Sequence, residues 1–221
     1  MTDTAHPRQR RPRNSLTVES ILDAGEGVAS AGFEALTVRA VADELGASPM
    51  ALYRYFATKD ELVDALLDRV LGRIEPAPET DDPLEDLAVF ALYHRAMLLA
   101  HPWAIAPLFG RPLPGPNALP IGENALRILS QAGITGDDAV AVFSGILALN
   151  YGWAAFTVGR VGLQGPVTAE RIAAPPDPGL PLTASVAEAM GRYGSDEHYG
   201  TVLTALLTGV GALAGTESRA V

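Results

Sequence analysis

Helix-capping signals punctuate the first part of this chain, and they restrict its fold more than any other feature. Four residues whose side chains accept hydrogen bonds at helix N-termini precede runs with helical apolar spacing: Thr17, Thr37, Ser48 and Thr58. Pro49 follows Ser48 at the first helical position, where its missing N–H costs nothing. Thr58-Lys59-Asp60-Glu61 has the pattern of a capping box, so a fourth helix is expected from there to about Ile74.

These signals divide the first part of the chain into short helices. Gly32 is expected to end the first helix, whose apolar positions keep to one stripe. Residues 38–45 form the expected second helix, which Gly46 ends. The expected third helix runs from Ser48 to about Ala57. Two short helices joined by a glycine-containing turn have helix-turn-helix geometry.

The expected third helix presents two faces. Leu52 and Phe56 are four residues apart and face the core. The side chains that point away are those of Met50, Ala51, Tyr53 and Arg54. This outward face suits the major groove of DNA, because Arg can bond a guanine edge, Met and Ala can contact a thymine methyl, and Tyr can donate to a phosphate. Lys59, the chain's only lysine, lies in the first turn of the next helix, where helix N–H groups also attract an anion such as phosphate.

Helical spacing also dominates the rest of the chain, and no strand pattern with period two is evident. A Pro- and acid-rich connector, 75–83, precedes an expected helix over about 84–100. Residues 101–120 form a broken region with at most a short helix before Gly110. Another helix is expected over 121–132, stopped by Gly133, and residues 165–185 are expected to be mostly loop.

Two uncharged stretches, 139–159 and 199–216, raise the question of a membrane, since either has about the length that a span needs. Polar residues and glycines interrupt both stretches, and no Trp/Tyr girdle with flanking basic residues brackets them. A helix that is apolar all round can equally be buried in a bundle or at a dimer seam. We therefore expect no membrane partner, and a membrane-associated sensor is kept as an alternative.

Charge is spread unevenly along the chain. The net charge is −10, yet residues 1–60 hold seven Lys/Arg against eight Asp/Glu, so the acidity lies mostly behind them. The arginine-rich tip is expected to be a flexible arm, 1–14, that either solubilises the chain or reaches DNA phosphates and the minor groove: Arg8, Arg10, Arg11 and Arg13. The chain has no cysteine and its first residues have no apolar signal region, so we expect a cytoplasmic protein.

The segment GFEALTVRAVADELGASPMALYRYFATKDELVDAL closely resembles the DNA-binding domain of TetR-type (tetracycline-repressor-like) transcriptional regulators, and the match runs over residues 17–66. The resemblance implies that Thr37 and Arg39 approach DNA at the start of the second helix. It also implies that Lys59 binds backbone phosphate. The recognition surface that it implies comprises Ser48, Pro49, Met50, Ala51, Tyr53, Arg54 and Tyr55.

A weaker resemblance covers residues 94–160, where HPWAIAPLFGRP, GPNAL and the spacing to QAGITGDDAV are similar to the ligand-binding domain of the tetracycline-repressor branch. Leu108 stands where that branch has a metal-ligating histidine, so a magnesium–tetracycline effector is not expected, nor is any metal or cofactor. The uncharged helices, 137–160 and 196–214, resemble the pair that forms the family's four-helix dimer interface. A homodimer is therefore expected.

An effector pocket in this region would combine bulky apolar side chains with a few polar anchors, although packing of a core is the default role of such residues. The candidate positions are His94, Met97, His101, Trp103, Phe109, Asn117, Phe143, Asn150, Trp153 and Phe156. His94 and His101 are seven residues apart and could share a helix face. With a third ligand from Asp81 or Asp82 of the connector, whose direction the sequence does not give, they would define the second alternative, a metal-dependent enzyme.

The sequence thus predicts an all-α protein that is not an enzyme. Residues 1–62 are expected to form a DNA-binding helix-turn-helix domain of three helices, and residues 63–221 a helical ligand-binding and dimerisation domain. The expected function is that of a transcriptional regulator, a repressor, which a small and largely apolar ligand releases from a palindromic operator.

Overall fold

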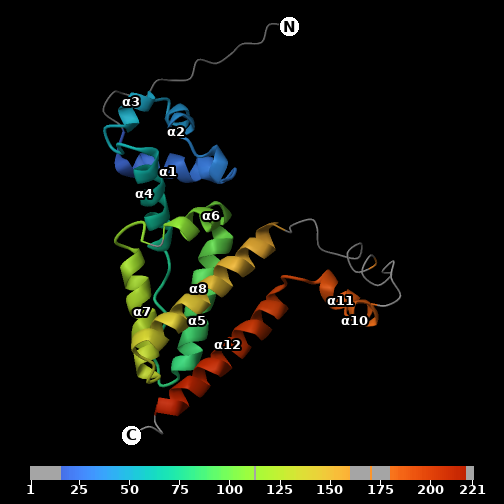
Figure 1. The fold of residues 1–221 in the computed structure, drawn as a ribbon. Helices are drawn as coiled ribbons and strands as arrows, with labels where there is room; N and C mark the ends of the chain where they lie inside the picture. Colours follow the sequence, from blue (N-terminus) through green and yellow to red (C-terminus); the bar gives the residue numbers. More distant parts are fainter. Residues whose placement is uncertain (1–15, 112, 160–169, 171–179, 218–221) are drawn as a thin grey trace. The chain divides into compact units, whose positions relative to one another are not determined.

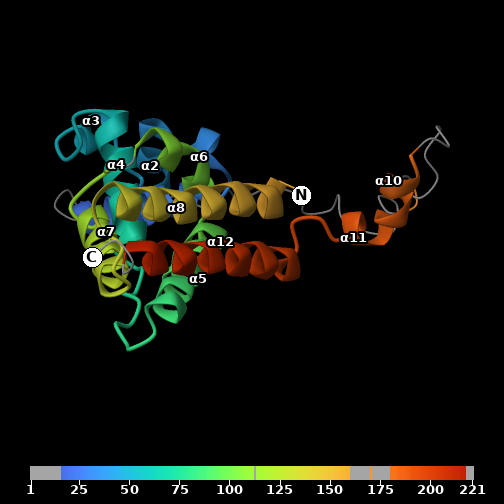
Figure 2. The ribbon, with the colours of Figure 1, turned by 60° about the horizontal axis from the view of Figure 1, so that its bottom comes forward.

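The computed structural model describes residues 16–111, 113–159, 170 and 180–217, and within these ranges every regular element is a helix (Figures 1 and 2). The predicted all-α fold is confirmed. The expected basic arm at 1–14 lies outside the described residues. The helices form two compact units, the first made of residues up to Arg73 together with His101–Pro120, and the second of Ile74–Ala100 with the chain from Ile121. The functional division predicted at residue 62 stays a prediction.

The first unit contains the short helices that the capping signals predict. They are α1 (Val18–Ala29), the 3₁₀ helix η1 (Phe33–Ala35), α2 (Val38–Glu44), α3 (Pro49–Leu52), α4 (Lys59–Leu71) and α6 (Pro102–Gly110). The hydroxyls of Thr17, Thr37 and Thr58 each accept the amide three residues on, at 3.0–3.1 Å. Each such cap contributes about 1 kcal/mol.

Two other capping expectations need correction. Ser48 occupies the N-cap position of α3, but its side chain makes no capping hydrogen bond. At the start of α4, the Glu61 carboxylate accepts the amide of Ala57 at 2.7 Å, one residue earlier than a capping box requires. Because Pro49 already lacks an N–H, the first turn of α3 has fewer donors for Ser48 to satisfy.

Close packing joins α1 to α4. Gly25 faces Leu66, and a Cβ at Gly25 would lie 3.0 Å from Leu66 Cδ1, so a small residue is needed at this crossing. Ile21, Leu62 and Leu66 are buried in the same core. The backbones of α1 and α4 lie so close together here that the space between them limits the size of the side chains that fit.

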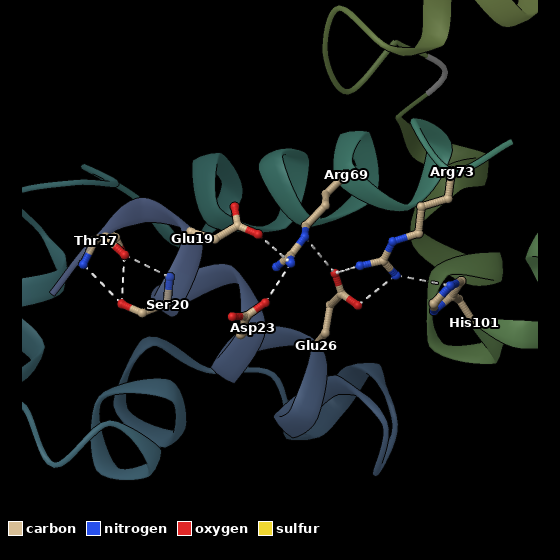
Figure 3. A network of polar contacts seen from close by, with 8 residues as sticks. All are labelled: Thr17, Glu19, Ser20, Asp23, Glu26, Arg69, Arg73 and His101. Carbon is tan, nitrogen blue, oxygen red and sulfur yellow. Dashed lines mark hydrogen bonds and ion pairs between the residues drawn. The ribbon is translucent and has the colours of Figure 1, made fainter.

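Ion pairs along the rim of this core tie α4 to α1 (Figure 3). Arg69 of α4 contacts the carboxylates of Glu19 at 2.7 Å, Asp23 at 2.6 Å and Glu26 at 3.3 Å. Arg73 holds Glu26 with two hydrogen bonds, of 2.9 and 2.8 Å, and lies 3.4 Å from Nε2 of His101 at the start of α6. Such paired geometry fixes orientation as well as distance.

In its described part, the second unit is built on four longer helices and two short ones. They are α5 (Pro83–Ala100), the larger part of α7 (Ala118–Gln131), α8 (Gly136–Gly159), α10 (Pro181–Ser185), α11 (Ala187–Gly191) and α12 (Asp196–Glu217). α5 packs against α8 and α12, which lie side by side in both views (Figures 1 and 2). The core between them includes Leu87, Phe90, Ile128, Ile146 and Leu203.

In the middle of the chain, one helix boundary and one predicted helix face differ from the sequence expectation. α7 begins at Ala118 rather than at Ile121. His94 and His101 do not share a helix, because α5 ends at Ala100 and His101 is the N-cap residue of α6. Pro102 disfavours helical backbone at the residue before it, and His101 accordingly has φ −128° and ψ 66°.

Among the described residues, α8 is long and apolar enough to cross a membrane by length and composition, and 28% of its most apolar window is buried. Soluble proteins whose core helices are apolar pass the same criterion.

Candidate nucleic-acid interface and effector site

The helix-turn-helix lies in the first unit, where α2 and α3 pack together. Gly46 adopts φ +64° in the connecting turn, a left-handed conformation that favours glycine. The amide of Ala47 donates to the carbonyl of Ala42 at 2.9 Å and closes the end of α2. The turn therefore sets the angle between the two helices through local geometry.

The third helix is shorter than the sequence indicates. α3 covers only Pro49–Leu52, and Tyr53, Arg54 and Tyr55 form a turn in which the Tyr55 amide donates to the Leu52 carbonyl at 2.8 Å. The hydroxyl of Tyr55 donates to the carbonyl of Leu16 at 2.7 Å, so this turn is bonded to the residue that precedes the N-cap of α1. Thr58 needs extended backbone to cap α4, so the chain has to leave the helix before it.

Of the four side chains that the spacing directs outward, Met50, Tyr53 and Arg54 are exposed, whereas Ala51 is half-buried. Met50 is 73% exposed, and Tyr53, Arg54 and Ser48 are also exposed. Leu52 is buried, whereas Phe56, Pro49 and Ala51 are half-buried. Tyr55 is exposed too, although its hydroxyl is bonded to Leu16.

Cations flank this surface. Lys59 is exposed as the first residue of α4, and its Nζ lies 5.3 Å from the ring centroid of Phe33. No carboxylate of the described residues pairs with Lys59 or Arg54. Arg39 is exposed at the start of α2, and its Nε lies 3.9 Å from a carboxylate oxygen of Asp43, which is a loose ion pair. Thr37 caps α2. Exposed cations around Met and Tyr side chains can bind a phosphate backbone and base edges together.

In the second unit, Asn150 of α8 is the centre of a buried polar network. Its amide nitrogen donates to the Ala91 carbonyl at 2.8 Å and approaches Nδ1 of His94 at 3.1 Å. Its carbonyl oxygen accepts the hydroxyl of Tyr199 at 2.6 Å. That acceptor role fixes the orientation of the amide, so Nδ1 of His94 accepts and the ring proton lies on Nε2.

Burial controls the ionisation of this network. Burial lowers the pKa of His94 to about 4, so the ring is neutral at pH 7. Burial also raises the pKa of the Tyr199 hydroxyl to about 12, which keeps it a donor. The network is therefore uncharged and internally satisfied, as a buried polar group requires.

Arg95 and Asp196 extend the network toward its edge. The Arg95 guanidinium lies 4.4 Å from the ring centroid of Tyr199 and 2.6 Å from the Asp196 carboxylate. Arg95 is buried, and its Nε has no hydrogen-bond partner among the described residues. The cation–π contact offsets part of the cost of burying this charge.

The other effector candidates divide between the units. Phe143 and Trp153 are half-buried in the second unit, Met97 is buried there, and Phe156 is 41% exposed. Aromatic contacts join Trp153 to Phe156 and to Tyr199. In the first unit, Trp103 is buried, His101 is half-buried, Phe109 is 63% exposed, and the exposed Asn117 is bonded to Asp68.

The sequence reading missed Tyr199 and Arg95. Tyr199 lies in an uncharged stretch that reads as a dimer helix, although a buried asparagine such as Asn150 requires a donor and an acceptor. The metal-enzyme alternative is not favoured. His94 bonds within its network, His101 belongs to the other unit, and no group of three metal-ligating side chains occurs among the described residues.

The geometry in the first unit is that of a helix-turn-helix regulator, and comparison with known proteins gives the family. The family model described as "Bacterial regulatory proteins, tetR family" matches residues 21–66. The model "Tetracyclin repressor-like, C-terminal domain" matches residues 75–214. The chain belongs to the tetR family of bacterial regulatory proteins.

Curated relatives support the same family. The repressor DrrR1 of Streptomyces coeruleorubidus is 36% identical over 147 residues, which are 63% of this chain and 53% of DrrR1. The class A tetracycline repressor from transposon 1721 in Escherichia coli is 32% identical over 133 residues, 59% of this chain and 58% of the relative. The chain thus spans only about half to six-tenths of the length of these relatives.

Solved structures show the same fold over most of the chain. Apo ActR from Streptomyces coelicolor superposes with a TM-score of 0.83 at 25% identity, over 93% of this chain and 100% of ActR. ActR in complex with actinorhodin gives a TM-score of 0.80 at 26% identity, over 90% and 99% of the two chains.

Proposed function

We propose that this protein is a DNA-binding transcriptional repressor that leaves a palindromic operator when a small, largely apolar molecule binds its helical second unit. The observation that carries the proposal is the exposed surface of Met50, Tyr53 and Arg54 beside Lys59, which pairs with no carboxylate of the described residues. Such a protein would act in the cytoplasm, without a membrane partner. Membership of a regulator family and the repressor relative DrrR1 support it.

The proposed division of labour follows the chemistry of the side chains. Arg54, Tyr53, Met50 and Ala51 would read base edges from the turn and the outward face of α3. Lys59, Thr37 and Arg39 would contact the backbone and set the register. Ser48, Pro49 and Tyr55 would line the same surface. The hydroxyl of Ser48 makes no capping bond and is exposed, which suits it to a phosphate.

A salt-titrated binding assay on the DNA upstream of the protein's own gene tests the proposal. Arg54→Ala is expected to weaken operator binding by about 1–3 kcal/mol and to relax base preference at one position. Lys59→Ala is expected to weaken all sequences alike and to reduce the slope of log affinity against log salt by about 1, because one fewer counterion is released.

Glu34→Ala serves as a matched control for the Arg54 and Lys59 variants, since Glu34 is exposed in the same unit but is an anion. The affinity of Glu34→Ala for the operator should not fall below that of the wild type. Equal DNA affinities of wild type and Lys59→Ala at every salt concentration would show that Lys59 is not part of the interface. Wild-type protein that binds no fragment would reject the proposed function.

The effector part of the proposal rests on the second unit. Actinorhodin is the ligand in one ActR structure, and the fold of ActR matches this chain closely. A mostly apolar core with the few polar groups of Asn150, His94 and Tyr199 has the composition of a small-molecule site. A ligand that binds the DNA-free state about a hundredfold better supplies close to 3 kcal/mol of coupling. Leu108 still argues against magnesium–tetracycline.

We also propose that α8 and α12 form the seam of a homodimer, because their apolar side chains remain exposed within the single chain. Val140 is 56%, Val202 40% and Leu213 43% exposed. Val202→Glu combined with Leu213→Glu is expected to raise the dimer dissociation constant at least tenfold, since a seam would bury the new charges. Sedimentation velocity over a concentration series measures it.

The control for the dimer is Val18→Glu, which places the same charge at a position of 48% exposure in the first unit. It should sediment like wild type, because an acid is tolerated in the first turn of α1. A double variant that remains fully dimeric would place the seam elsewhere.

A further inference from the structure

One face of α4 carries a row of carboxylates directly behind the proposed phosphate contact. Asp60, Asp64 and Asp68 are spaced four residues apart and therefore lie along one side of the helix. Asp60 is the residue after Lys59, and its side chain is 76% exposed. Like charges at this spacing destabilise a helix, and a carboxylate beside Lys59 repels an approaching phosphate.

A segment far along the chain covers this row. The guanidinium of Arg111, just after α6, donates to the carboxylate of Asp60 and lies 2.7 Å from that of Asp64 through Nε. The Asn117 backbone amide donates to Asp68 at 2.8 Å, and its side-chain amide donates to the same carboxylate at 2.9 Å. Asp60 and Asp68 thus accept hydrogen bonds from Arg111 and Asn117, whereas Asp64 is paired with Arg111 by charge alone, since its Oδ1 accepts no hydrogen bond among the described residues.

Backbone approach shows that the two segments fit closely. A Cβ at Gly115 would lie 2.4 Å from Cγ of Asp68, and one at Gly72 would lie 2.9 Å from Nδ2 of Asn117. Neither position could take a larger residue without moving the contact. The segment is therefore packed on α4 by shape as well as by charge, and both belong to the first compact unit.

We propose that Arg111, which lies outside the helix-turn-helix, is an affinity-determining residue for DNA that acts by neutralising Asp60 and Asp64. The inference rests on the proposed function, since it assumes that Lys59 meets a phosphate. Arg111 is a positioning and charge-compensating residue and does not contact bases. Its side chain is only 28% exposed, so its charge is directed at the carboxylates of α4.

The effect should be electrostatic in character. Exposed charges interact over roughly 10 Å at 0.1 M salt, and Asp60 is adjacent to Lys59 in sequence. Without Arg111, two uncompensated carboxylates would repel the phosphate that Lys59 attracts. Arg111→Gln is therefore expected to weaken operator binding about three- to tenfold at 0.1 M salt, and the deficit should shrink as salt rises.

The test compares full-length variants by fluorescence anisotropy with an operator fragment that the wild type binds. Arg111→Lys keeps the charge and should recover most of the affinity. Asp60→Asn with Asp64→Asn should restore the Arg111→Gln protein to within about twofold of wild type, because nothing then needs compensation. In the wild-type background, the same pair of asparagines should tighten binding.

Three results would overturn the inference. Arg111→Gln could bind like wild type at low salt, or its defect could persist after both aspartates are neutralised, which would show a purely structural role. The asparagine pair alone could fail to tighten binding, an outcome that does not depend on the folding of Arg111→Gln. A wild-type protein that binds no DNA would reject the proposed function as well, so the two failures are distinguishable.

Discussion

Replacing Asn150 by leucine is expected to lower the free energy of unfolding by about 3–5 kcal/mol, a large part of the stability of an ordinary domain. Leucine has the same branching and number of side-chain heavy atoms as asparagine, but it leaves the Tyr199 hydroxyl without its acceptor and His94 Nδ1 without its donor. The Ala91 carbonyl also loses the bond from Asn150, although it lies within α5. Each buried orphan costs about 1–3 kcal/mol. Urea unfolding followed by circular dichroism at fixed protein concentration measures the loss.

Tyr199→Phe is the matched variant, since it removes a single hydroxyl from the same network. It should cost about 1–2 kcal/mol, because only one hydrogen bond of Asn150 is lost. The double variant should be more stable than the sum of the two single losses predicts, as the leucine and phenylalanine no longer leave an unpaired hydroxyl. A loss below about 1 kcal/mol for Asn150→Leu would mean that water or another group replaces these contacts.

Acidification is expected to destabilise the protein through His94 by about 3 kcal/mol. Burial lowers the pKa of His94 to about 4 in the folded state, against 6.5 for the free side chain. Between these values the unfolded chain binds the proton and the folded chain does not. The contribution is therefore complete above about pH 6.5 and is lost as the pH falls toward 4.

His94→Gln isolates this effect, because its carbonyl can accept the Asn150 amide but does not titrate. Between pH 7.5 and pH 4.5, the free energy of unfolding should fall further in wild type than in His94→Gln. The extra loss should be at least about 2 kcal/mol, in line with the pKa shift of His94. His101→Gln is the second control, because burial and the nearby Arg73 also lower the pKa of His101. This variant separates the contribution of His101 to the pH dependence from that of His94. Identical pH dependence in wild type and His94→Gln would show that the pKa of His94 does not differ between the folded and the unfolded chain.

Local signals made most of the first unit predictable. Thr17, Thr37 and Thr58 cap their helices with bonds that span only three residues, and Gly46 sits in the left-handed turn that its place after α2 suggested. Helical spacing correctly predicted the exposure of Met50, Tyr53 and Arg54 but not the half-burial of Ala51. Such features depend on neighbours in sequence, so a sequence reading can find them.

Long-range contacts set the features that the sequence left open. The predicted length of α3 was wrong by several residues, and the turn that replaces its last part is bonded through the Tyr55 hydroxyl to Leu16, 39 positions away. The pairing of Asn150 with Tyr199 joins residues 49 apart on two different helices. The shared helix face on which the metal-site alternative relied is absent, because α5 ends before Pro102 and His94 and His101 belong to different helices. Nothing in the local pattern encodes these partners.

The first unit is discontinuous along the chain, and this orders its assembly during translation. The helices up to α4 are synthesised before Arg111 and Asn117, and the whole of α5 is made in between. A nascent chain that ends at Arg73 already holds the helix-turn-helix, but the aspartates of α4 still face water with no counter-charge. The first unit is therefore complete only after residues from the middle of the polypeptide have been synthesised.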